Sequence, residues 1–297
     1  MDKLKNISRN TIQALVSLAY NFHIPNFFKG RIYGGQGKKI CLPGLNCYSC
    51  PGASGSCPIG SLQAVMGSKK YKFSYYVFGM MAFFGVIVAR LICGFLCPMG
   101  WFQDLIHKIP TKKFSTKKLK PLRFIKYAIL FSLIIALGLV LGDKYEVIPP
   151  YFCKYICPQG IIQGAIPLAI KNPSLRLGLG SLFNLKLGIL ITTIILSVIF
   201  YRPFCKWICP LGAFYSFFNK YSFYQINVDK NKCIDCGKCA KVCKMDVDIR
   251  KNNAHLECIR CHECTKACPT KAISSSLLQR RENEKDEQIL STSSSRA

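Results

Sequence analysis

The sequence is poor in acidic residues and in histidine. Its 297 residues include 14 Asp and Glu against 41 Lys and Arg, and only four scattered histidines. No arrangement of these groups suits the general acid–base catalysis of a hydrolytic enzyme. The net charge of +27 would suit a nucleic-acid-binding protein, but the basic residues lie in loops that border apolar stretches. Basic residues beside membrane spans attract anionic lipid headgroups, so we expect membrane lipid, and not nucleic acid, as a partner.

Hydrophobic residues make up half of the chain, and they gather in long stretches. A helix needs ~20 residues to cross a bilayer core of about 30 Å. Three stretches meet this requirement: Phe73–Ile92, Phe124–Gly142 and Leu185–Pro203. A fourth, Thr11–Phe28, is interrupted by polar residues and Pro25, and is either a short first span or an interfacial helix. No signal-peptide cleavage site follows it, so we expect it to stay attached.

The three long stretches have an alternative interpretation as buried core helices of a soluble domain. Their basic flanks and the aromatic residues at their ends (Tyr75, Tyr76, Trp101 and Trp207) are typical of membrane spans. We therefore predict a mainly α-helical protein with three, or possibly four, transmembrane helices.

Eight of the 18 cysteines form two consecutive runs near the C-terminus, each with the pattern Cys-x-x-Cys-x-x-Cys-x-x-x-Cys. This spacing is that of bacterial two-cluster ferredoxins, in which the fourth cysteine of each run binds the other cluster. The rule predicts two [4Fe–4S] sites: Cys233, Cys236, Cys239 and Cys268 form one, and Cys258, Cys261, Cys264 and Cys243 form the other. Zinc knuckles would explain the Cys-x-x-Cys halves, but not a spacing of three cysteines and then one that occurs twice.

The other cysteines belong to an internal repeat. The sequence Cys-x-x-x-Cys-Pro occurs at Cys93/Cys97, Cys153/Cys157 and Cys205/Cys209, and Cys-Pro-x-Gly begins at Cys57, Cys97, Cys157 and Cys209. A glutamine follows six residues after the cysteine in three of these units: Gln63, Gln103 and Gln163. We expect these glutamines either to hydrogen-bond cluster sulphurs, which would tune a potential, or to satisfy backbone groups freed by the proline.

The repeat predicts how the membrane-domain cysteines group. One apolar stretch separates two modules, so their spans run in the same direction. Cys93, Cys97, Cys205 and Cys209 then lie at the membrane face that also carries the ferredoxin segment, and offer the four thiolates that a cubane cluster needs. Cys57, Cys153 and Cys157, with Cys47 or Cys50 as the fourth, would lie at the opposite face. Free cysteines are an alternative for both sets, and disulfides for the second.

These motifs carry a family resemblance. Paired Cys-x-x-x-Cys-Pro sequences at the ends of apolar stretches, followed by two ferredoxin runs, resemble the NapH/NosR group of polytopic iron–sulphur proteins, and NapH-type ferredoxins most closely, over roughly residues 10–275. The resemblance implies a cytoplasmic C-terminal ferredoxin region and electron transfer between the quinone pool and a partner protein. The segment from Cys41 to Pro51 and the pair Cys153/Cys157 exceed the simplest form of the family pattern, and large N-terminal accessory domains are absent from the sequence.

Four regions follow: an N-terminal segment (1–40), a duplicated membrane domain (41–220), a two-cluster α+β ferredoxin domain (221–273) and a polar, disordered tail (274–297). We predict a multi-pass inner-membrane protein whose ferredoxin domain is cytoplasmic, because its thiolates must stay reduced. It would pass electrons between cytoplasmic carriers, quinone and a partner redox protein, as a subunit of a quinone-linked oxidoreductase. Besides the two ferredoxin clusters, we expect one or two further [4Fe–4S] clusters. The alternative is a thiol-redox or metal-handling protein that uses the extracytoplasmic cysteines.

Overall fold

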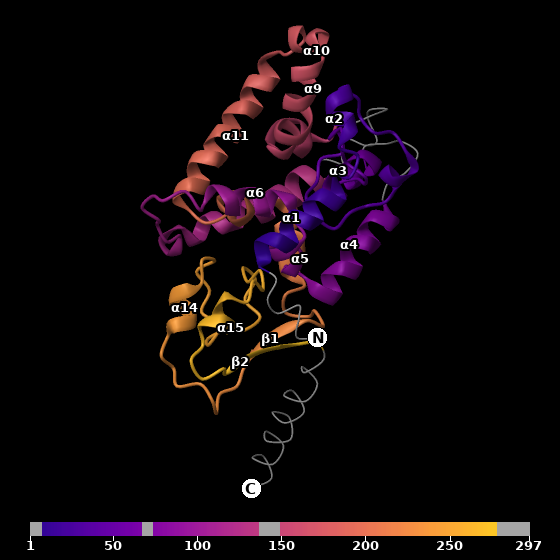
Figure 1. The fold of residues 1–297 in the computed structure, drawn as a ribbon. Coiled ribbons are helices and arrows are strands. Elements are labelled where there is room, and N and C mark those ends of the chain that lie inside the picture. Colours follow the sequence, from indigo (N-terminus) through magenta and orange to yellow (C-terminus); the bar gives the residue numbers. More distant parts are fainter. Residues whose placement is uncertain (1–7, 67–73, 137–148, 278–297) are drawn as a thin grey trace.

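The computed structural model describes residues 8–66, 74–136 and 149–277. Figure 1 shows a large helical domain with a small unit at one end, where α14, α15 and the two strands lie together. At the other end lie α9, α10 and the start of α11, and α1, α5 and α6 lie between the two ends. The helical domain contains the predicted membrane region, and the small unit contains both ferredoxin runs.

The first half of the helical domain consists of short helices. They are α1 (Arg9–Tyr20), α2 (Pro25–Lys29), η2 (Gln36–Lys39), α3 (Pro58–Met66), α4 (Tyr75–Val88), α5 (Leu91–Phe95) and α6 (Pro98–Ile106). The second half follows with η3 (Lys117–Phe124), α7 (Ile125–Ile129), η4 (Leu130–Ala136), η5 (Phe152–Ile156), η6 (Ile161–Ala165), α9 (Ile166–Lys171), α10 (Pro173–Leu177), α11 (Ser181–Ile199), α12 (Pro203–Trp207) and α13 (Pro210–Phe217).

The predicted spans correspond to helices of different lengths. Among the described residues, only α11 is both long enough and apolar enough to cross a membrane, with a mean hydropathy of 2.1. Within the stretch Phe73–Ile92, α4 covers the 14 residues Tyr75–Val88, and Phe73 lies outside the described part. The stretch Phe124–Gly142 forms α7 and η4, and its residues 137–142 lie outside the described part. The N-terminal stretch forms α1, of 12 residues, and then α2.

Several apolar side chains of α11 face outward. Leu190, Thr193 and Ser197 are buried, whereas Leu185, Ile191 and Ile195 are exposed. Each of the two buried hydroxyls donates a hydrogen bond to a carbonyl four residues earlier in the helix. A helix of a soluble protein places its apolar stripe inward, so this outward apolar face indicates an apolar surrounding.

The small unit has the two-fold repeat of its sequence. Strands β1 (Gln225–Val228) and β2 (Ile273–Ser276) pair antiparallel, with Gln225 opposite Ser276. The helices α14 (Lys238–Val242) and α15 (Glu263–Ala267) each follow the second cysteine of a run. Because β2 extends to Ser276, the unit continues three residues into the region that the sequence assigned to the tail; residues 278–297 of that tail lie outside the described part.

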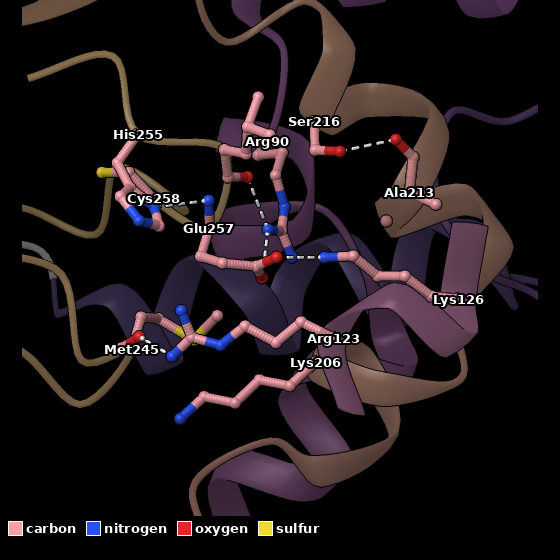
Figure 2. A network of polar contacts seen from close by, with 12 residues as sticks. Arg90, Arg123, Lys126, Lys206, Ala213, Ser216, Met245, His255, Glu257 and Cys258 are labelled. Atoms are coloured by element: carbon pink, nitrogen blue, oxygen red, sulfur yellow. Dashed lines mark hydrogen bonds and ion pairs between the residues drawn. The ribbon is translucent and has the colours of Figure 1, made fainter. Parts of the chain in front are cut away.

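A buried ion-pair network joins the small unit to the helical domain (Figure 2). Glu257, next to Cys258, accepts hydrogen bonds from Arg90 at 2.8 Å and from Lys126 at 2.5 Å. All three side chains are almost wholly buried. Burial alone would raise the pKa of Glu257, but the two cations outweigh it and lower this pKa to about 2. The carboxylate therefore stays ionised at neutral pH.

Backbone contacts bring the second ferredoxin run against the same surface. Asn219 donates to the carbonyl groups of His255, Leu256 and Cys258. A Cβ atom added at Gly94 would lie only 2.5 Å from the carbonyl oxygen of Ile259. Gly94 lies between Cys93 and Cys97, and Ile259 follows Cys258, so a cysteine loop of each domain touches the other.

We expect Glu257→Gln to loosen this interface, because it leaves the buried Arg90 and Lys126 without a counter-charge. Removing one partner of a buried ion pair costs about 3–5 kcal/mol. The measurement is the temperature at which the full chain loses its iron–sulphur absorbance, together with the rate of proteolysis after Phe217. Asp229→Asn is the matched control, because its ion pair with Lys232 is exposed and contributes little. Equal melting temperatures for the two variants would contradict the expectation.

Gly94→Ala tests the close approach of the two domains. The added methyl group must displace the backbone at Ile259, since the distance of 2.5 Å is too short for any carbon–oxygen contact. We expect faster proteolysis between the domains and a lower melting temperature. Gly188→Ala is the matched control, because nothing lies within 4 Å of the corresponding position in α11. If both alanine variants behave like the wild type, the domains are not in contact at Gly94.

Candidate metal centres

The two ferredoxin runs adopt the same backbone conformation. In each run the residues on both sides of the second cysteine have positive φ angles: Asp235 and Gly237 in the first run, Arg260 and His262 in the second. Asp246 and Lys271, each three residues after the fourth cysteine of its run, share this conformation. Positive φ is uncommon for residues other than glycine. The matched positions indicate that both loops fold around the same kind of centre.

In the structure, the fourth cysteine of each run lies beside the first three cysteines of the other run, where the spacing predicted it. A small cavity is lined by Cys233, Cys236 and Cys239 of the first run together with Cys268 of the second. Cys243 of the first run lies within electrostatic range of Cys258, Cys261 and Cys264 of the second. The structure thus brings together both predicted sets of four thiols.

The two ferredoxin sets differ in their surroundings. Cys236 of the first set is exposed. Cys243 and Cys261 of the second set pack against the core of the helical domain. One set therefore faces the surface, and the other faces the cysteines of the helical domain.

The Cys-Pro-x-Gly sequences have a common local structure, because proline is well suited to the first turn of a helix. Pro58, Pro98 and Pro210 begin α3, α6 and α13. In all four units the cysteine sulphur accepts a hydrogen bond from the backbone N–H of the glycine three residues later. N–H groups at a helix start favour a negative charge, so each unit is suited to hold a thiolate.

The paired cysteines do not lie on one continuous helix. Cys93 lies in α5, which ends at Phe95, and Cys97 is the N-cap of α6. Cys205 and Cys209 are placed in the same way by α12 and α13. The two thiols of a pair therefore do not share one helical face, because the first helix ends before the second cysteine and the proline after that cysteine starts the next helix.

The structure brings Cys93, Cys97, Cys205 and Cys209 together in the core. All four are buried, and Cys209 lies within electrostatic range of the other three. Gln103 donates a hydrogen bond of 3.1 Å to the sulphur of Cys205 and accepts one from the backbone of Phe204. Gln103 thus spans the two modules and contacts a candidate ligand.

Two buried arginines each reach from their own module to the other one, and the sequence did not lead us to predict these contacts. Arg202, three residues before Cys205, donates to the carbonyl of Cys93 and pairs with Asp104. Its guanidinium lies 3.0 Å from the position of a Cβ at Gly100. Arg90, three residues before Cys93, approaches Gly212 in the same manner at 3.6 Å. The Arg-x-x-Cys spacing, which occurs in both modules, could have indicated that the two arginines have equivalent roles.

A second set of thiols surrounds a cavity of about 740 Å³, which is lined by Cys47, Cys57, Cys153 and Cys157. Cys50 lies apart from this cavity, and its sulphur donates to Asn21 at 3.2 Å. Gln163 accepts a hydrogen bond from the backbone of Cys47 at 2.8 Å, whereas Gln63 donates to the carbonyl of Leu133. Of the three glutamines, Gln103 alone donates a hydrogen bond to a candidate ligand sulphur within the described residues.

All 18 cysteines lie in the described part, and none of them forms a disulfide there. Within that part, no three His, Cys, Asp or Glu side chains converge as they would around a single metal ion. The ligands of a cubane stand farther apart, because each binds a different corner of the cluster. The chemistry of these donor sets, four thiols with helix-start N–H groups, fits a [4Fe–4S] cluster.

Comparison with known protein families supports iron–sulphur binding. Residues 75–117, 127–169 and 186–230 each match a 4Fe–4S binding domain, and residues 220–281 match a 4Fe–4S dicluster domain. Each of the first three segments contains one Cys-x-x-x-Cys-Pro pair. The N-terminal segment with Cys41, Cys47, Cys50 and Cys57 precedes all of them. No solved structure matches the chain.

Several curated proteins are similar to the chain. The uncharacterized protein MJ0750 of Methanocaldococcus jannaschii is 32% identical over 201 residues, which are 64% of this chain and 74% of that protein. The putative electron transport protein YccM of Escherichia coli is 26% identical, over 56% of this chain and 44% of its own length. The ferredoxin-type protein NapH of Haemophilus influenzae is 25% identical, over 55% of this chain and 50% of its own. The match thus spans about half the length of YccM and of NapH. With these relatives and the matched domains, the chain belongs to the family of ferredoxin-type iron–sulphur electron-transport proteins that includes NapH.

Proposed function

We propose that this protein is a multi-pass membrane protein that passes electrons between cytoplasmic carriers, the quinone pool and a partner redox protein. The observation that carries the proposal is the sequence of thiol sets through the molecule. The set with the exposed Cys236 is followed by the set with Cys261, which packs on the core that contains Cys93 and Cys97. When bound, a [4Fe–4S] cluster supplies one-electron redox chemistry.

The residues around each set have separate roles in this proposal. Cys236 and its neighbours present the outermost set to a soluble carrier. Glu257, Arg90 and Asn219 hold the second ferredoxin run against the helical domain. Gln103 donates to Cys205 and would raise the potential of a centre held there, because hydrogen bonds to ligand sulphur stabilise the reduced form.

The membrane location in this proposal is supported by α11 and by the outward-facing apolar side chains. Aromatic and aliphatic residues of α1, α4 and α11 are exposed, among them Leu15, Phe83 and Ile195. Large exposed apolar areas mark surfaces that contact lipid or protein. Placing the ferredoxin unit in the cytoplasm rests on the need of its thiolates for a reducing compartment.

The alternative thiol-redox function has less support. Reactive cysteines are partly exposed and have a lowered pKa. Burial raises the pKa of both Cys57 and Cys157 to about 12. As free thiols these groups would be protonated and shielded, and hence poor nucleophiles.

A reoxidation experiment tests the proposed function. The full chain, purified anaerobically and placed in liposomes, is reduced with dithionite, freed of excess reductant and mixed with menaquinone. We expect the iron–sulphur absorbance to recover quickly in the wild type, and much more slowly in Cys209→Ser, which breaks the set nearest the ferredoxin unit. Equal rates in the two proteins, or no recovery in either, would contradict electron transfer to quinone through the membrane domain.

A second prediction concerns the set of Cys93, Cys97, Cys205 and Cys209. Because each module supplies two of the four thiols, Cys97→Ser and Cys209→Ser should each abolish the same spectroscopic centre and about four iron atoms per chain. The double variant should lose nothing further. The measurements are iron and acid-labile sulphide content and low-temperature EPR of the reduced protein. If the single variants lose different centres, the set does not share one cluster.

A further inference from the structure

The cavity bordered by Cys47, Cys57, Cys153 and Cys157 is built from two Cys-Pro-x-Gly units and one loop. At Gly60, which follows Cys57, a Cβ atom would lie 3.6 Å from the sulphur of Cys153. At Gly160, which follows Cys157, a Cβ atom would lie 3.9 Å from the sulphur of Cys47. The two glycines thus leave space between thiols that come from distant parts of the chain. The volume of about 740 Å³ is many times the ~30 Å³ share of one water molecule.

The polar groups beside this cavity suit an anionic occupant. The ammonium group of Lys186 donates to the carbonyl of Cys153 at 3.1 Å and borders the cavity. Lys38 and Lys186 both lie within electrostatic range of the Cys47 sulphur. Four thiolates around one centre carry a concentrated negative charge, and buried charge of this kind needs nearby opposite charge.

The loop that carries Cys47 also reaches the first membrane-domain set. The backbone N–H of Leu45 donates a hydrogen bond to the sulphur of Cys97. The preceding residue, Gly44, is packed so closely that its Cβ would lie 3.3 Å from the Cα of Cys97. Cys47 follows two residues later, and two residues span at most about 7 Å. A ligand of one set and a ligand of the other are thus joined by one short segment, although we expected the two sets at opposite membrane faces.

Hydrogen bonds hold this segment in one position. Asn46 is wholly buried, accepts from Gln163 at 2.9 Å and from Asn21 at 3.2 Å, and donates to the carbonyl of Tyr20. The amide oxygen of Gln163 accepts from the backbone of Cys47. Gln163 follows Cys157 in its Cys-Pro-x-Gly unit, so it ties the Cys157 helix to the Cys47 loop.

We propose that Cys47, Cys57, Cys153 and Cys157 bind a fourth [4Fe–4S] cluster, directly beside the set that contains Cys97, with Leu45–Cys47 as the bridge between the two sites. The proposal rests on the proposed function and extends it, because it adds an electron-carrying centre in contact with the last one. It also selects Cys47 over Cys50 as the ligand from the N-terminal segment, which no matched family domain covers.

The test compares Cys47→Ser with Cys50→Ser in the full chain, produced anaerobically with cluster assembly supported. We expect about sixteen iron atoms in the wild type and in Cys50→Ser, and about twelve in Cys47→Ser. Since a serine oxygen can replace a thiolate, Cys157→Ala is measured beside it and should give the same loss. The double variant Cys47→Ser/Cys157→Ala should lose no more iron than either single variant.

EPR of the reduced protein tests whether the two sites adjoin. Neighbouring reduced clusters broaden each other's signals, so the centre that disappears in Cys97→Ser should sharpen in Cys157→Ala and stay unchanged in Cys50→Ser. An unaltered signal in Cys157→Ala would overturn the adjacency. If the wild type holds about twelve iron atoms per chain and Cys97→Ser loses four of them, the fourth cluster does not exist, but the proposed function still stands. If the wild type holds only about eight iron atoms per chain, and Cys97→Ser does not lower that number, the proposed function itself is contradicted.

Discussion

The candidate sites of the helical domain all depend on helices that start at a cysteine followed by proline. The proline ends the preceding turn and begins a new helix, so the cysteine occupies the position where free N–H groups meet its sulphur. The glycine two residues after the proline allows a different close contact at each site. At Gly100 it leaves room for the guanidinium of Arg202, and at Gly60 for the sulphur of Cys153. One local motif therefore fixes both the direction of the thiol and the close approach of its neighbour.

Buried charge connects these sites with one another. The chain has only 14 acidic residues, and three of them lie at junctions beside candidate ligands. Asp104 joins Arg202 of the second module to the first, Glu257 joins the ferredoxin unit to Arg90, and Asp246 joins it to Lys206. Each acid neutralises a cation that lies within three residues of a cysteine. Because Asp104 and Glu257 each pair with two cations, positive charge remains to offset that of the thiolates, while the ion pairs hold the modules and the ferredoxin unit together.

The sequence predicted two ferredoxin runs and a grouping of the cysteines, and the structure brings most of the grouped cysteines close together. The spacing of the runs assigned Cys268 and Cys243 to the opposite sets, because the exchange follows from the repeat itself. The contacts of Arg90 and Arg202 with the opposite module were not predicted, although the two residues occupy equivalent positions in the repeat. The position of Cys47 could not be predicted, because the loop from Cys41 to Cys50 has no periodic pattern and its path depends on hydrogen bonds from Asn21 and Gln163.

Helix length explains why the two membrane-domain sets lie closer together than the sequence suggested. The expectation of opposite faces assumed that each apolar stretch crosses the whole bilayer. Between Cys57 and Cys93, however, α4 has 14 residues and spans about 21 Å, which is less than a hydrocarbon core of about 30 Å. Cysteines beside such a helix lie inside the protein and not at its two faces. An interior position excludes water and makes uncompensated thiolates costly, which accounts for the buried Arg90 and Arg202 and the half-buried Lys186 beside them. In the proposed function, no mobile carrier is needed between the sets, because one short loop contacts Cys97 and carries Cys47.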